Sequence, residues 1–210
     1  MIWVKICGIT NAEDAAAALE AGADALGFNF WRPGRRYLAP GAAAAIIETL
    51  PPQIAKVGVF VDEEPAEVLA IARQAGLTAV QLHGSEPPEY LDRLGPYQKL
   101  KAFRVDDRFC AETLGRYRAD AFLLDAAGST PGGTGARFDW RAAIAAKRFG
   151  RIILAGGLTA ENAGEAVRQV APWGVDVASG VEREPGRKDP RLLREFIRAV
   201  REAEGRDGSG

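Results

Sequence analysis

The sequence has very few of the residues that build metal centres and disulfide frameworks. Its 210 residues include two cysteines, Cys7 and Cys110, and a single histidine, His83. The two cysteines lie far apart in the chain and neither has the spacing of a zinc-ligand pair. We therefore expect no metal site, and nothing in the sequence supports a disulfide bond.

The sequence also lacks an excess of charge of either sign. It has 27 Lys and Arg against 28 Asp and Glu, a formal net charge of -1, which argues against a nucleic acid or an anionic membrane as a partner. No apolar run approaches the roughly 20 residues that a membrane-spanning helix needs. The first ten residues, MIWVKICGIT, have neither the basic region nor the cleavage-site pattern of a signal peptide. We expect a cytoplasmic protein in which local groups hold any acidic substrate.

Short apolar runs alternate with Ala-rich and Leu-rich segments along the whole chain, which is the pattern of repeated βα units. The expected strands, apolar at nearly every position as strands buried on both faces are, are Ile2–Cys7, Ala25–Phe30, Ala55–Val61, Ala79–Leu82, Leu100–Arg104, Ala121–Asp125, Ile152–Ala155 and Val175–Ala178. The expected helices are Ala12–Ala21, Gly41–Leu50, Pro65–Gln74, Pro87–Leu94, Arg108–Tyr117, Trp140–Lys147, Ala160–Val170 and Pro190–Ala203. These pairs predict an α/β fold, a single-domain (β/α)8 TIM barrel over residues 1–203, with a frayed tail at residues 204–210.

A cysteine and an aspartate each end an expected strand, Cys7 in KICGIT and Asp125 in FLLDA. In a barrel of this kind the carboxyl ends of the strands meet at one face, and that face carries the active site. A thiol and a carboxylate placed there can move protons in opposite directions, which favours an acid-base isomerase or lyase. Considered alone, Cys7 could be a small buried hydrophobe and Asp125 a helix cap or loop anchor.

Glycine-bearing turns follow the last two expected strands. AGGL contains Gly156 and Gly157, and SGVE contains Ser179 and Gly180. Unhindered backbone amides at such positions bind phosphate, and barrels of this class place a phosphate site there. Because the P-loop pattern is absent, we expect the phosphate of a small molecule. One glycine pair alone could equally form a tight turn.

The loop after FLLDA is longer than the usual connection from a strand to a helix. It contains Gly132, Gly133 and Gly135. We expect it to fold over bound substrate as a lid and to exclude water. A flexible surface loop is the alternative.

Eight motifs that occur in order and at barrel spacing resemble the phosphoribosylanthranilate isomerase family. They are KICGIT, FxWxPGRRY, VGVFV, QLHG, LLDA, GGTG followed by FDW, LAGGL and DVASGVE, and together they cover nearly the whole chain. The resemblance implies a (β/α)8 barrel, no cofactor and a small-molecule substrate. The implied reaction belongs to tryptophan biosynthesis: the Amadori rearrangement of N-(5′-phosphoribosyl)anthranilate to 1-(o-carboxyphenylamino)-1-deoxyribulose 5-phosphate.

By this resemblance Asp125 is the general acid and Cys7 the general base. A free cysteine has a pKa of about 8.5, so something has to lower it. Lys5, two residues earlier on the same strand, and the helix N-terminus after Gly8 are the candidates. Asp125 has to hold a proton, which burial or a neighbouring negative charge would favour.

The resemblance also implies a set of substrate-binding side chains. Arg36, in RRY, matches the arginine that orients the substrate, and we expect it to bind the anthranilate carboxylate in bidentate fashion. Gln81 and His83, in QLHG, are expected to make hydrogen bonds. Asp176, in DVASGVE, is expected to position substrate or to order the phosphate loop.

Three alternatives to this activity remain open. The histidine-pathway aminoaldose isomerase performs the same chemistry with a pair of aspartates, and indole-glycerol-phosphate synthase uses a lysine acid and an additional N-terminal segment. The third alternative is a barrel that binds a phosphate ligand without catalysis. The sequence leaves open whether the protein is a monomer or a homodimer.

Overall fold

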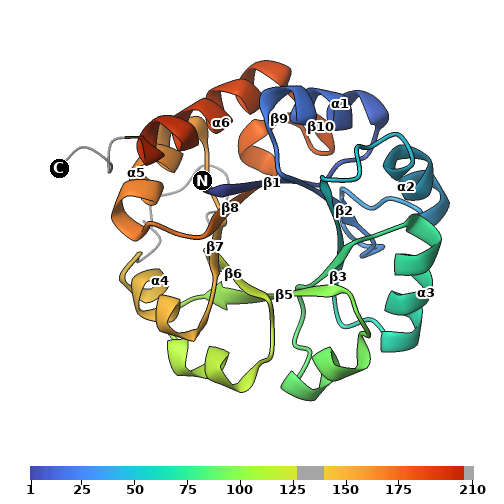
Figure 1. The fold of residues 1–210 in the computed structure, drawn as a ribbon, viewed down its shortest axis with the longest axis horizontal. Helices are drawn as coiled ribbons and strands as arrows, with labels where there is room; N and C mark the ends of the chain where they lie inside the picture. Colours follow the sequence, from blue (N-terminus) through green and yellow to red (C-terminus); the bar gives the residue numbers. More distant parts are fainter. Residues whose placement is uncertain (127–139, 206–210) are drawn as a thin grey trace.

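The computed structural model describes residues 1–126 and 140–205. Eight parallel strands close into a barrel in the order β1-β2-β3-β4-β5-β6-β7-β8, and the helices surround this ring (Figure 1). The predicted (β/α)8 barrel is therefore confirmed. No helix among the described residues is long and apolar enough to cross a membrane.

The strands agree with the sequence prediction to within two residues at each end. They are β1 (Trp3–Cys7), β2 (Ala25–Asn29), β3 (Ala55–Phe60), β4 (Ala79–Leu82), β5 (Gln98–Val105), β6 (Ala121–Ala126), β7 (Ile152–Ala155) and β8 (Gly174–Val177). The barrel closes between the first and last strands, where Lys5 of β1 is in register with Asp176 of β8. This register places the two side chains at the same level inside the barrel.

The helices differ from the prediction in two places. The α-helices are α1 (Ala12–Ala21), α2 (Pro40–Ile47), α3 (Pro65–Ala75), α4 (Trp140–Ala146), α5 (Ala160–Val170) and α6 (Pro190–Glu204), and the short 3-10 segments are η1 (Pro88–Arg93), η2 (Ala111–Arg116), η3 (Lys147–Phe149) and η4 (Ser179–Val181). The helices expected after the fourth and fifth strands are thus the 3-10 segments η1 and η2. Both span six residues, and short 3-10 turns are frequent as connectors between elements.

Three helix ends follow the sequence signals closely. α1 begins at Asn11, whose side chain accepts a hydrogen bond from the backbone N–H of Asp14. α1 and α3 end at Gly22 and Gly76, with φ angles of 99° and 72°. Glycine adopts this left-handed conformation without steric cost, so both helices stop where the next strand has to begin.

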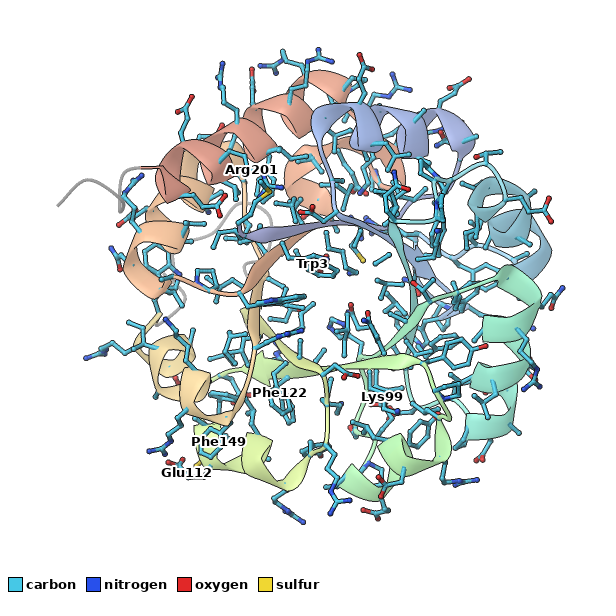
Figure 2. The ribbon with its side chains drawn as sticks, in the orientation of Figure 1. Trp3, Lys99, Glu112, Phe122, Phe149 and Arg201 are labelled. Atoms are coloured by element: carbon cyan, nitrogen blue, oxygen red, sulfur yellow. The ribbon has the colours of Figure 1, made fainter. Side chains whose placement is uncertain are left out.

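The apolar core has an inner and an outer layer. Small and branched side chains such as Val57, Leu123 and Ile153 fill the inside of the barrel, while a larger cluster packs between the strands and the helices. Trp3, which lies within the ring of strands in Figure 2, stacks on Trp173 with ring centroids 5.0 Å apart. The filled interior leaves the strand ends as the place where polar side chains can gather.

A short hairpin follows the last barrel strand. It consists of β9 (Glu182–Glu184) and β10 (Arg187–Lys188), which pair antiparallel. In Figure 1 the hairpin lies beside β1 and α1, on the outside of the barrel. It thereby brings residues from near the C-terminus to the end of the first strand.

Candidate active site

A cavity of about 550 Å³ opens at the carboxyl ends of the strands. Every predicted site residue that the structure describes lines this cavity: Cys7, Arg36, Gln81, His83, Asp125, Gly156, Gly157, Asp176, Ser179 and Gly180. The glycines of the predicted lid, Gly132, Gly133 and Gly135, lie outside the described residues. The fold thus brings side chains from distant parts of the sequence to one cavity.

Cys7 is the last residue of β1 and its sulfur faces Gly27 of β2. A Cβ atom on Gly27 would lie 2.9 Å from the Cys7 Sγ and 3.1 Å from the Lys5 Cε. The missing side chain at Gly27 therefore makes room for the thiol and for the end of the lysine. Sequence analysis did not single out Gly27, because a glycine inside a strand gives no sign of which neighbour needs the space.

Lys5 lies below Cys7 inside the barrel and forms an ion pair with Asp176. The Lys5 Nζ is 2.8 Å from the Asp176 Oδ1, and the two side chains are 0% and 9% exposed. Burial by itself would lower the pKa of Lys5, but the nearby carboxylate of Asp176 more than compensates and the pKa is raised. Lys5 therefore stays charged, and the contact that the structure shows for Asp176 is with this lysine.

The thiol of Cys7 has a raised pKa. Burial is the largest influence and raises the pKa above its ordinary value, although Cys7 borders the cavity. The cations Lys5 and Lys188 offset only part of this increase. Lys5, one of the two candidates for lowering this pKa, acts in the expected direction, but burial outweighs it. In the resting protein near neutral pH the thiol is protonated, and it has to lose its proton before it can act as a base.

Asp125 is the next-to-last residue of β6. A chain of two hydrogen bonds holds it, through Gln81 of β4 and His83, which follows β4. The Gln81 Nε2 lies 2.9 Å from the His83 Nδ1, and the His83 Nε2 lies 3.2 Å from the Asp125 Oδ2. The side chains of His83 and Asp125 are 34% and 35% exposed. The expected burial of Asp125 is thus not found among the described residues, and its carboxyl group faces the open cavity.

Arg36 reaches the cavity from the loop after β2, but one edge of its guanidinium is already occupied. The Arg36 Nε donates to the Glu182 Oε1 at 2.8 Å and the Arg36 Nη2 donates to the Glu182 Oε2 at 2.6 Å. This edge is therefore not available to a substrate, and the expected contact of Arg36 with the anthranilate carboxylate stays a prediction. The Nη1 end of the guanidinium is the part that remains for a carboxylate.

The two glycine-bearing turns lie against each other at the far side of the cavity. Gly156 and Gly157 have φ angles of 79° and 66°, a conformation that glycine tolerates best. A Cβ atom on Gly180 would lie 1.9 Å from the carbonyl oxygen of Leu158. A side chain at Gly180 would therefore push the turn after β8 away from the turn after β7.

Sequence analysis missed two charged residues of the site, Glu182 and Lys188. They come from the hairpin, in which Lys188 is in register with Glu182. The segment EREPGRK contains a Pro-Gly turn between two short polar runs, which is a hairpin signal. That signal could have predicted that the two charges face each other.

Comparisons with known proteins agree with this geometry. The family model described as N-(5'phosphoribosyl)anthranilate (PRA) isomerase matches residues 4–199. The N-(5'-phosphoribosyl)anthranilate isomerase of Trichlorobacter lovleyi is 51% identical over 205 residues, which cover 97% of this chain and 100% of the relative. The isomerase of Geobacter sulfurreducens is 52% identical over 202 residues, covering 96% and 99%.

Solved structures show the same relationship. The crystal structure of phosphoribosyl anthranilate isomerase from Thermotoga maritima superposes with a TM-score of 0.90 at 41% identity, over 96% of this chain and 100% of that protein. A second crystal structure, of the isomerase in complex with reduced 1-(o-carboxyphenylamino)-1-deoxyribulose 5-phosphate, gives a TM-score of 0.87 at 40% identity, with the same coverage of both chains. With the family model matched over nearly its whole length, this chain belongs to the N-(5′-phosphoribosyl)anthranilate isomerase family.

Proposed function

We propose that this protein catalyses the Amadori rearrangement of N-(5′-phosphoribosyl)anthranilate to 1-(o-carboxyphenylamino)-1-deoxyribulose 5-phosphate, a step of tryptophan biosynthesis. The observation that carries the proposal is that Cys7 and Asp125 line one cavity from different sides of the barrel. In the closed barrel, β7 and β8 lie between β6, which carries Asp125, and β1, which carries Cys7. A substrate between the two side chains can receive a proton from one and give a proton to the other.

The first step is the opening of the ribose ring. Asp125, in its protonated form, gives a proton to the ring oxygen while the bond between that oxygen and C1′ breaks. The lone pair of the anthranilate nitrogen forms a double bond to C1′, which produces a protonated Schiff base. The hydrogen bond between the His83 Nε2 and the Asp125 Oδ2 orients the carboxyl group toward the cavity.

The second step removes the proton at C2′. The positive charge of the Schiff base acidifies this carbon, and the thiolate of Cys7 takes the proton while the electron pair forms the C1′–C2′ double bond of an enolamine. The enolamine then loses the C2′ hydroxyl proton and gains a proton at C1′, which gives the ketone. A thiol with a raised pKa is a strong base once it is ionised.

The remaining residues of the site hold the phosphate and the carboxylate of the substrate. We assign the phosphate to the turns that contain Gly156, Gly157 and Gly180, because glycine backbones allow close approach to a phosphate. The carboxylate is assigned to Arg36. We further propose that Gln81 contributes through His83, and Asp176 through Lys5. Ser179 is assigned to the phosphate turn together with Gly180.

The partners of the protein follow from the same proposal. We expect a phosphorylated small molecule as substrate and propose no nucleic acid or membrane partner, in a cytoplasmic protein. A relative from Thermotoga maritima, 39% identical, is described as a dimeric isomerase from which monomers were generated. For this chain we keep both a monomer and a homodimer in the proposal, and sedimentation equilibrium distinguishes them.

The experiment that tests the function is the decay of phosphoribosylanthranilate fluorescence in the presence of purified protein, with Cys7→Ala as the control. We expect the decay with the wild type and its loss in the variant. A folded wild type that binds the reduced product without turnover would instead indicate a binding protein. Absence of both binding and turnover would indicate the substrate of another phosphate-binding barrel, such as the histidine-pathway isomerase.

A further inference from the structure

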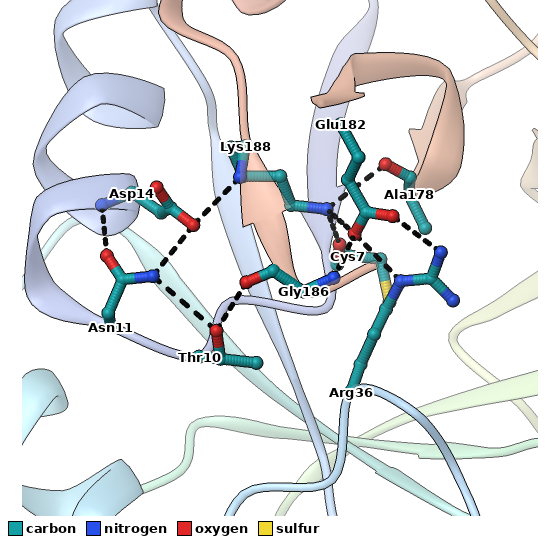
Figure 3. A network of polar contacts seen from close by, with 9 residues as sticks. All are labelled: Cys7, Thr10, Asn11, Asp14, Arg36, Ala178, Glu182, Gly186 and Lys188. Carbon is teal, nitrogen blue, oxygen red and sulfur yellow. Dashed lines mark hydrogen bonds and ion pairs between the residues drawn. The ribbon is translucent and has the colours of Figure 1, made fainter. Parts of the chain in front are cut away.

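Glu182 lies behind Arg36 and joins two cations (Figure 3). Besides its two hydrogen bonds from Arg36, it accepts one from the Lys188 Nζ, 2.9 Å from the Glu182 Oε1. The side chains of Glu182 and Lys188 are 4% and 0% exposed. Burying such charges is costly unless each is paired and hydrogen-bonded. The cost indicates that the pair has a role in the neighbouring site.

Lys188 ties Glu182 to the ends of two barrel strands. Its ammonium group donates to the carbonyl oxygens of Cys7, at 2.5 Å, and Ala178, at 3.1 Å, as well as to Glu182. An ammonium group has three donors, so these contacts use all of them. The backbone N–H of Lys188 also donates to the Asp14 Oδ2 at 2.9 Å. The carboxylate behind Arg36 is thereby fixed to β1, which carries the catalytic thiol.

Glu182 carries its negative charge between two cationic side chains. Burial by itself would raise the pKa of Glu182, but the hydrogen bonds from Arg36 and the charge of Lys188 outweigh it and lower the pKa. Glu182 is therefore ionised. Burial lowers the pKa of Lys188, although the carboxylate of Glu182 opposes this shift. Arg36, whose side chain is 26% exposed, presents its guanidinium to the cavity, where it can meet a carboxylate on a ligand.

The glycine after Cys7 completes the position of Arg36. A Cβ atom on Gly8 would lie 2.3 Å from the Arg36 Cδ, so the stem of the arginine crosses the chain where a side chain is missing. Gly8 thus borders the stem and Glu182 holds one edge of the guanidinium. The opposite edge, which includes Nη1, remains to meet a ligand.

We propose that Glu182, anchored by Lys188, is a positioning residue that orients Arg36 for the carboxylate of the anthranilate ring. This inference rests on the proposed function and identifies what makes Arg36 selective for the carboxylate of the substrate. In the absence of the carboxylate of Glu182, Arg36 is free to leave this geometry, and it repels Lys188 across the site. Glu182 touches no substrate atom in this arrangement and acts through Arg36.

The test is Glu182→Gln, which keeps the size of the side chain but places an amide N–H₂ against cationic donors. The probes are reduced 1-(o-carboxyphenylamino)-1-deoxyribulose 5-phosphate and the same amine without the ortho-carboxylate, with their Kd values measured by calorimetry. Loss of one charge-assisted contact predicts an affinity for the carboxylate probe weaker by about tenfold. The affinity for the probe without the carboxylate changes by less than about twofold. In turnover the KM rises and kcat stays near the wild-type value.

Two controls separate positioning from damage to the fold. Glu184→Gln makes the same change at an exposed position of β9 and leaves both Kd values unchanged. In an Arg36→Ala background, Glu182→Gln has no further effect on the carboxylate probe, because the residues act as one unit. Equal weakening of both probes, or no weakening of either, overturns the inference. A wild type that neither converts phosphoribosylanthranilate nor binds the carboxylate probe overturns the proposed function instead.

Discussion

The two proposed catalytic side chains lie in very different surroundings. Cys7 is enclosed by a charged network that joins β1, β8 and the hairpin, with Lys5 and Asp176 inside the barrel and Lys188 on its backbone. Asp125, by contrast, is 35% exposed and is contacted by His83 at the edge of the cavity. The base is therefore built into the framework of the ligand-free protein, whereas the acid faces the space that substrate fills.

This difference predicts two kinds of consequence. Changes around Cys7 remove members of a buried network, so they affect stability as well as turnover. Changes around Asp125 remove a side chain that faces the open cavity, so they affect turnover alone. A substitution at Asp125 that lowers stability, or one in the network around Cys7 that does not, would show that the two surroundings differ less than their contacts indicate.

Cys7→Ala is the substitution with the largest expected effect on turnover. Removing the base at C2′ lowers kcat by about 10³–10⁴-fold, because no other thiol borders the described part of the cavity. Affinity for the reduced product is retained, since the Ala side chain fits beside Gly27. Steady-state fluorescence kinetics and calorimetry measure the two quantities. Turnover in Cys7→Ala or Cys7→Ser within tenfold of the wild type would exclude the thiol as the base.

Lys5→Met tests the buried network beneath the thiol. Removing one partner leaves the carboxylate of Asp176 unpaired inside the barrel, which lowers the free energy of unfolding by about 3–5 kcal/mol. Adding Asp176→Asn recovers most of this loss, because the buried charge is then gone. Urea unfolding of both variants measures the difference, and Lys99→Met, at a partly exposed position of β5, is the control. A single variant as stable as the control would mean that Asp176 finds another partner.

Asp125→Asn lowers kcat by about 10²–10³-fold, less than the loss of the thiol, because water in the open cavity can still deliver a proton slowly. Its free energy of unfolding changes by less than about 0.5 kcal/mol, as expected for a side chain that holds no buried network. Rapid-mixing kinetics and urea unfolding give both numbers. A large loss of stability in this variant would erase the distinction between the two sides.

The raised pKa of Cys7 predicts the pH dependence of its alkylation. The thiol reacts only when it is deprotonated, so the rate of alkylation by iodoacetamide rises with pH and levels off only above the ordinary thiol pKa. Below that region the ionised fraction grows on the order of tenfold per pH unit. The measurement uses a Cys110→Ser background because Cys110 is exposed. A plateau that begins near pH 7 would contradict the dominance of burial. Turnover does not follow this curve, because Asp125 has to hold its proton while Cys7 loses one.

The sequence predicts the framework of the site well, for a physical reason. Barrel strands are buried on both faces, so their apolar runs are visible in the sequence, and residues at their ends, such as Cys7 and Asp125, fall on one face by topology alone. The α-helices predicted after β4 and β5 were wrong, because both segments are six-residue 3-10 helices. Apolar periodicity alone does not show where such a segment ends.

The electrostatic arrangement of the site could not be predicted in the same way. The direction of the pKa shift at Cys7 depends on the balance between burial and two cations, and only coordinates set that balance. The pairing of Arg36 with Glu182 joins positions 146 residues apart. Charges such as these look like ordinary surface residues in the sequence, because nothing local distinguishes a buried ion pair from a solvated one.

Gln81→Met is the substitution with the smallest expected effect and the sharpest readout. Because the Gln81 Nε2 faces the His83 Nδ1, the hydrogen of His83 lies on Nε2 and points at the Asp125 Oδ2. The Gln81 Oε1 is then buried without a partner among the described residues. The opposite orientation of the amide lets that oxygen accept from Nδ1–H, and Nε2 then accepts a hydrogen from the protonated acid. The orientation of the Gln81 amide thus links the tautomer of His83 to whether Asp125 carries a proton.

His83 is the only histidine in the chain, so its ring nitrogens give a single pair of signals in a ¹⁵N long-range correlation spectrum. We expect the Nε2–H tautomer in the ligand-free wild type and a mixture of both tautomers in Gln81→Met, because methionine neither donates to nor accepts from the ring as strongly as an amide. Losing one neutral hydrogen bond lowers kcat by about threefold to tenfold, with KM nearly unchanged. If the variant keeps the wild-type spectrum, Gln81 does not select the tautomer, and the orientation of His83 has to come from Asp125 alone.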